Sequence, residues 1–218
     1  MTEPPQADLE SLFDLIRSGG PMMVPIGVCS VVALAYATER WIRLQPAYLG
    51  KAAFGREVVA AAAQRGVRSA LELCEQRTSP LGRILAAGLR HASSPFLDRE
   101  KAVEDAAATE MKRLGANLRP LLLVYLIAPL LGLLGTVWGM IAAFSEIALQ
   151  SGLGKPELLA AGIYQALTTT AAGLAVAIPA IVMHHYLRGR IELFARRSED
   201  LYRELEAQLA PLAEKAVA

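Results

Sequence analysis

Residues 120–145 read PLLLVYLIAPLLGLLGTVWGMIAAFS, and this stretch decides the fold. It contains no charged side chain and lies between Arg119 and Glu146. An α-helix needs about 20 mostly apolar residues to cross the hydrocarbon core of a bilayer. The stretch therefore predicts a transmembrane helix.

Two further charge-free windows occupy residues 18–38 and 158–187. Both are long enough to span a bilayer, and their excess length can be taken up by tilt. Residues 1–17 carry more acidic than basic side chains, unlike the basic start of a signal peptide, so we expect the first window to be retained. The three windows predict an all-α integral membrane protein with three transmembrane helices.

Basic side chains cluster after the first window, before the second and after the third, which by the positive-inside rule predicts an N-terminus on the outer side of the membrane and a cytoplasmic C-terminus. The predicted segments are an outer interfacial amphipathic helix at 1–17, transmembrane helix 1 at 18–43, a cytoplasmic helical region at 44–118, transmembrane helix 2 at 119–148, an outer loop at 149–157, transmembrane helix 3 at 158–187 and a cytoplasmic helical tail at 188–218.

The region between the first two windows lacks the alternation of a β-strand. Its pattern predicts four helices, at about 51–65, 67–77, 80–92 and 97–118. We expect the last of them to run without a break into transmembrane helix 2, and the tail to continue helix 3. The charge run that includes Arg99 is interpreted as a solvated helix face.

No enzyme signature occurs in the chain: P-loop, HExxH, GxSxG and GxGxxG motifs are all missing. His184 and His185 lie at the end of the third window, where interfacial side chains reach water, and no further metal ligands accompany them. The net charge of +1 gives no reason to expect a nucleic-acid partner. We therefore expect a protein that is not an enzyme and that needs no cofactor or metal.

Spans two and three each carry a stripe of small residues with one threonine near mid-membrane, Thr136 or Thr170. Small residues allow close packing of helices, which explains Gly132, Gly139, Gly162 and Gly173. The threonines have two readings of comparable weight: they line a polar pore, or their hydroxyls bond to the helix backbone. The sequence pattern leaves both open.

Gln165 and Thr169 add polarity to span three, where polar groups are costly and usually face a bundle interior or another subunit. Gln165 lies roughly 140° around the helix from Thr170, so the two side chains serve different faces. We interpret Gln165 and Thr169 as polar groups of a pore or of a subunit interface.

Three stretches carry a family resemblance. PLLGLLGTVWGMIAAF at 129–144, GIYQALTTTAAGLAVAIPA at 162–180 and GGPMMVPIGVCSVVALAYATERW at 19–41 resemble the spans of the MotA/TolQ/ExbB proton-channel family. The order of elements is similar too. Three predicted spans place the chain nearer the ExbB/TolQ branch, because the MotA branch has four.

The resemblance implies a ring subunit, typically in a pentamer, of an inner-membrane motor in bacteria. Its implied partners are an ExbD/TolR-like single-span protein, whose aspartate titrates, and a TonB- or TolA-like energy transducer. Thr136 and Thr170 match the pore threonines of the family. Gln165 departs from the pattern, since well-studied ExbB members have glutamate there, and a neutral amide cannot titrate. A non-conducting membrane scaffold is the alternative function.

Overall fold

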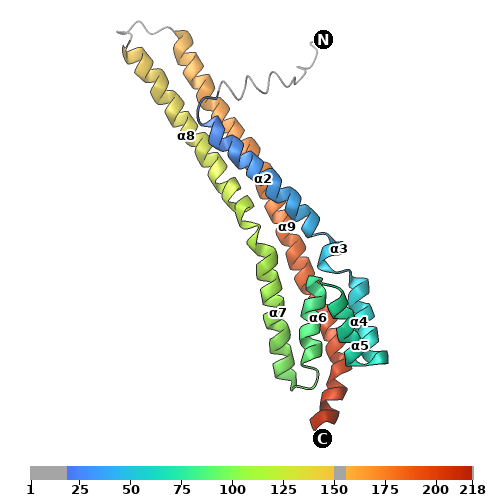
Figure 1. The fold of residues 1–218 in the computed structure, drawn as a ribbon. Helices are drawn as coiled ribbons and strands as arrows, with labels where there is room; N and C mark the ends of the chain where they lie inside the picture. The colour runs from blue at the N-terminus through green and yellow to red at the C-terminus, as the bar shows by residue number, and fades with distance from the viewer. Residues whose placement is uncertain (1–18, 150–155, 218) are drawn as a thin grey trace, which may run out of the picture. The chain divides into compact units, whose positions relative to one another are not determined.

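The computed structural model describes residues 19–149 and 156–217, and within these ranges the chain is helical and has no strand (Figure 1). The predicted amphipathic helix at 1–17 lies outside the described residues, as does most of the predicted loop at 149–157.

Three of the described helices are long and apolar enough to cross a membrane. They include α2 at Met23–Arg43, α8 at Arg119–Leu149 and the first part of α9, which runs over Pro156–Val217. The predicted fold class, an all-α protein with three spans, is therefore confirmed. The expected continuation of span three into the tail is present as well, because α9 is one helix of 62 residues.

Five further helices lie between α2 and α8: α3 at Pro46–Leu49, α4 at Ala52–Arg65, α5 at Val67–Gln76, α6 at Pro80–Arg90 and α7 at Phe96–Ala116. Local chemistry explains where α6 begins. Ser79 Oγ accepts the Gly82 N–H at 3.1 Å, and Pro80 occupies the first turn, where its missing N–H costs nothing. Helix α3 was not predicted, because four residues are too few to show a hydrophobic period.

The expectation of one continuous helix from 97 through span two is wrong, since a turn at Asn117–Leu118 separates α7 from α8. Pro120 explains the break. Its ring clashes with the carbonyl of the residue four positions earlier, and it cannot donate a backbone hydrogen bond. The helix therefore ends at Ala116, and Pro120 lies in the first turn of α8.

The chain forms two compact units. The first, which we call the apolar unit, contains Met1–Ala37 and Arg119–His184; the second, the polar unit, contains Thr38–Leu118 and His185–Ala218. Each has its own packing. In the polar unit, α4 and α6 pack on the last part of α9, where Leu205 and Leu209 are fully buried.

The polar unit also buries charge. Arg99, expected on a solvated face, is only 2% exposed, and its Nη2 bonds Glu206 Oε1 at 2.5 Å. Its Nη1 donates to the Ser94 carbonyl at 2.5 Å, and Tyr202 donates to Glu206 at 3.0 Å. The solvated interpretation of this residue is therefore wrong: a salt bridge to a distant part of the chain compensates for its burial, and helix periodicity carries no sign of such a partner.

Candidate functional site

The contact between α8 and α9 in the apolar unit is built from small residues. A Cβ atom on Gly173 would lie 2.6 Å from the Ala128 carbonyl oxygen, and one on Gly132 would lie 2.9 Å from the Thr169 carbonyl oxygen. A Cβ atom on Gly139 would lie 3.2 Å from the Gly162 carbonyl oxygen. All four glycines that we expected at a close helix contact thus lie on this one seam, where the backbones of two helices meet directly.

Two threonine hydroxyls converge on one backbone atom of this seam. Thr170 Oγ1 donates to the Gly132 carbonyl oxygen at 3.1 Å, and Thr169 Oγ1 lies 3.4 Å from the same oxygen. Thr169 also donates to Ala166 within α9, at 2.7 Å, and is 1% exposed. In an α-helix the Gly132 carbonyl is also the acceptor for the Thr136 N–H. The polar groups are therefore satisfied inside the chain, as a site in lipid requires.

Thr136 lies one turn along α8 from Gly132 and is half-buried. Its hydroxyl donates to the Leu133 carbonyl at 2.6 Å. The side chain also lines an open groove together with residues of the same helix: Val137, Met140, Ile141, Phe144 and Ser145. Among the described residues only α8 lines this groove, so the groove beside Thr136 is open on its other side.

The side chain of Gln165 points in a different direction from that of Thr170. Its amide group lies against the backbone of Gly20, which has φ +69° and immediately precedes the turn into α2. A Cβ at Gly20 would displace that amide, and the positive φ strains any other residue, so the position favours glycine. Within the chain, Gln165 therefore joins the start of α2 to α9.

Gly135 is a member of the seam that sequence reasoning missed. A Cβ atom there would lie 2.5 Å from Thr169 Oγ1. Gly135 falls off the stripe that contains Gly132 and Gly139, but it is three residues from one and four from the other. The i, i+3, i+4 rule for helix faces could have identified it.

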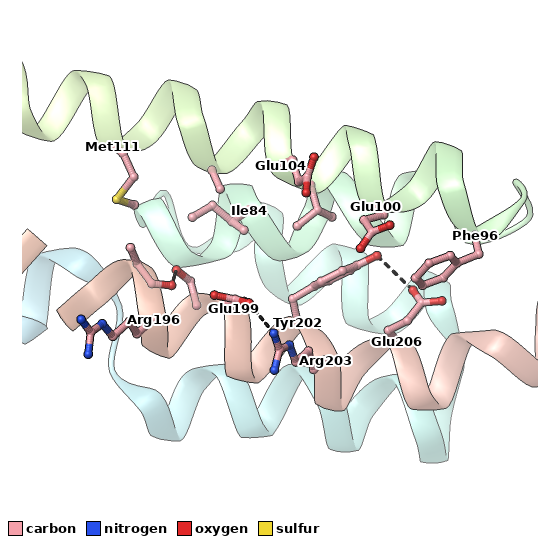
Figure 2. Close-up of a pocket in the computed structure, with 14 residues that line it drawn as sticks. Ile84, Phe96, Glu100, Glu104, Met111, Arg196, Glu199, Tyr202, Arg203 and Glu206 are labelled. Carbon is pink, nitrogen blue, oxygen red and sulfur yellow. Dashed lines mark hydrogen bonds and ion pairs between the residues drawn. The ribbon is translucent and has the colours of Figure 1, made fainter. Parts of the chain in front are cut away.

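The polar unit holds a second candidate region, a groove of about 630 Å³ between α7 and the last part of α9 (Figure 2). Its charged lining includes Glu100, Glu104, Arg196, Glu199, Arg203 and Glu206. Figure 2 shows Tyr202 bonded to Glu206 across its floor and Arg203 paired with Glu199 at its edge. Carboxylates outnumber cations in this lining, and much of the charge is internally paired.

Cys74 and Arg83 are among the groups elsewhere in this unit that have shifted pKa values. Burial raises the pKa of the Cys74 thiol to about 11, with a further contribution from Glu75. The side-chain hydrogen bond to Glu110 raises the pKa of Arg83, whose Nε lies 2.6 Å from Glu110 Oε1. The first effect favours the neutral thiol and the second favours the charged guanidinium, and neither prepares a group for catalysis. Among the described residues no cluster of three or more His, Cys, Asp or Glu could hold a metal ion.

Most of the chain is similar to known proteins. A model of the MotA/TolQ/ExbB proton channel family matches residues 76–200. The chain is 35% identical over 177 residues to biopolymer transport protein exbB1 of Vibrio cholerae, covering 79% of this chain and 77% of that protein. It is 37% identical over 184 residues to a putative ExbB-like protein of Synechocystis, covering 81% and 70%. The ExbB protein of Neisseria meningitidis serogroup A is 26% identical over 213 residues, covering 89% and 95%.

Proposed function

The chain belongs to the MotA/TolQ/ExbB proton channel family, on its ExbB-like branch, and we propose that it is the ring subunit of a motor driven by the proton-motive force. In this proposal several copies, five by family resemblance, surround an ExbD/TolR-like single-span partner in the inner membrane. Proton flow drives motion that a TonB- or TolA-like transducer passes to outer-membrane transport or to another envelope process.

The observation that carries the proposal is the family match, which includes all of α8 and the membrane part of α9. The geometry of the seam supports it. Thr136 is half-buried beside an open groove, and Thr170 is half-buried with its hydroxyl on Gly132. A ring of such subunits would present two threonine rows to a helix at its centre.

The proton step then needs a carboxylate from the partner. The windows 120–145 and 158–187 contain no acidic or basic residue other than His184 and His185 at the end of the second. We propose that a partner aspartate carries the proton and that Thr136 and Thr170 provide the hydroxyls along its path. One elementary charge crossing 100 mV releases about 2.3 kcal/mol, so each transferred proton supplies a modest step of work.

The orientation follows from the distribution of charge. Arginines and lysines gather at those ends of the three apolar windows that continue along the chain into the polar unit. We propose that the polar unit is cytoplasmic and that the N-terminus is periplasmic.

A scaffold without ion flow is the second candidate, and the position of Gln165 favours it. The side chain at this position is neutral and lies against Gly20 of the same chain. In the motor, Gln165 would tune the pore or a subunit interface by hydrogen bonding. In the scaffold, it would only hold α2 on α9.

Replacing Thr170 with Val tests the motor. The two side chains have nearly the same shape, but valine cannot donate to Gly132 or solvate a proton. We expect assembly with the single-span partner to persist and proton flux into liposomes to fall at least about tenfold, the rate cost of 1.4 kcal/mol. The matched control is Thr168→Val, because the Thr168 hydroxyl donates within α9, to Tyr164 at 2.8 Å.

Full flux in the Thr170→Val complex would remove Thr170 from the proton path. A wild-type complex that contains the partner and passes no protons under a potential would instead establish the scaffold.

A further inference from the structure

A small pocket lies on another face of α9 from the groove described above, entirely within the polar unit. Its floor is apolar, formed by the segment around α3 and by α9, and its volume is about 70 Å³. Arg190 and Arg197 lie at its rim, and no carboxylate is among its lining residues. The two arginines are two helical turns apart, so they project from one face of α9.

The two arginines differ from their neighbours in their partners. Arg188 pairs with Glu192 at 3.1 Å and Arg203 with Glu199 at 2.6 Å. Within the part of the chain that the structure describes, neither Arg190 nor Arg197 forms an ion pair. Arg190 instead lies over the Tyr186 ring, 5.9 Å from its centre, and donates to the Tyr186 hydroxyl at 3.3 Å. The pocket therefore carries two positive charges that no carboxylate of the described chain neutralises.

The pocket follows directly after an apolar window. Tyr186 is next to the last residue of the window 158–187, and its ring stacks on Trp41, near the end of α2, at 5.3 Å. Both rings are 46% exposed, and Tyr48 of α3 is 60% exposed. Exposed tyrosine and tryptophan rings beside arginines are typical of the headgroup level of a bilayer.

We propose that Arg190 and Arg197 bind the phosphate of an anionic phospholipid of the cytoplasmic leaflet. The guanidinium groups match a phosphate in charge and in hydrogen-bond geometry. The acyl chains of the lipid remain in the bilayer beside Trp41.

This site rests on the proposed orientation of the polar unit but not on proton flow. Loss of proton flux in Thr170→Val would leave lipid binding unchanged, and loss of lipid binding would leave the proposed role of the threonines in the proton path unaffected. The two proposals therefore fail independently.

The test uses the full-length chain, purified as its complex in a neutral detergent and titrated with phosphatidylglycerol or phosphatidylcholine. Native mass spectrometry counts the lipid molecules retained per chain. We expect phosphatidylglycerol to be retained preferentially, and the Arg190→Gln, Arg197→Gln pair to weaken its retention about 25-fold, roughly fivefold for each arginine. Phosphatidylcholine retention should not change.

The matched control is the pair Arg188→Gln, Arg203→Gln, which removes the same charge from the same helix but from arginines that already have carboxylate partners. An equal loss in both pairs would overturn the proposal, because it would indicate attraction to net charge alone. Competition by inorganic phosphate at the affinity of the lipid would also overturn it, since the site would then be a general anion site. Size-exclusion chromatography and circular dichroism check that each variant is folded, and partial recovery with Arg197→Lys supports binding by charge.

Discussion

The two parts of α9 belong to one helix, but they pack by different chemistry. In residues 156–184 the contacts are made by Gly162, Gly173 and two threonines, and carbonyl oxygens lie directly against Cα atoms of α8. In residues 185–211 the contacts are made by large side chains such as Phe194, Leu205 and Leu209 and by the ion pair of Glu206, whose side chain is 13% exposed. The first part approaches its neighbour closely, and the second fills space with side chains.

The difference follows from the surroundings of each part. In lipid, apolar side chains gain nothing by leaving the solvent, so helix association depends on close van der Waals contact and on hydrogen bonds. In water, burial of each leucine contributes roughly 1.5–3 kcal/mol, so large side chains are favoured. The same helix thus uses glycine where it is surrounded by lipid and leucine where it is surrounded by water.

The largest expected effect concerns the buried ion pair of the polar unit. Replacing Arg99 with Met leaves the Glu206 carboxylate, whose side chain is 13% exposed, without its cation, and the free energy of unfolding should fall by about 3 kcal/mol, the lower end of the range for breaking a buried pair. Thermal unfolding in detergent, monitored by circular dichroism, measures the loss.

The matched control for Arg99 is Arg203→Gln, which breaks an exposed pair with Glu199 and should cost no more than about 0.5 kcal/mol. The double variant Arg99→Met, Glu206→Leu should recover most of the loss, because it leaves no charge buried. A double variant as unstable as Arg99→Met would show that Arg99 acts through its bonds to the backbone carbonyls.

A smaller effect is expected at the membrane seam. Replacing Gly173 with Ala places a methyl group 2.6 Å from the Ala128 carbonyl oxygen, so α8 and α9 must separate. Overpacking of this kind typically costs about 1–3 kcal/mol. The apparent melting temperature of the purified complex should fall by roughly 2–4 °C for each kcal/mol. An unchanged melting temperature would contradict the close-contact account of the seam.

The smallest effect has the opposite sign. Gly189 lies on the same helix but has no atom near the position that a Cβ would take. Replacing Gly189 with Ala should stabilise α9 by about 0.5–1 kcal/mol through helix propensity alone. The same unfolding measurement checks it. Destabilisation at both glycines would indicate that position 189 packs on another chain in the complex.

Residues 129–144 and 162–180 show how far sequence reasoning reached into the candidate site. Their spacing placed Gly132, Gly139, Gly162 and Gly173 on small-residue stripes, because a helix has a fixed period. The same period separated Gln165 from Thr170. It could not reveal that Gln165 lies against Gly20, since that contact depends on how α2 meets α9 and not on either helix alone.

The sequence by itself determined the three spans, the helical class and the family, because hydropathy and local motifs are properties of short segments. Tertiary structure decided which polar groups are buried and by what they are satisfied. Arg99 meets Glu206 across a separation of 107 residues, and Thr170 finds its acceptor on Gly132, 38 residues away. Such partners are determined by packing in three dimensions, so no periodicity along the chain indicates them.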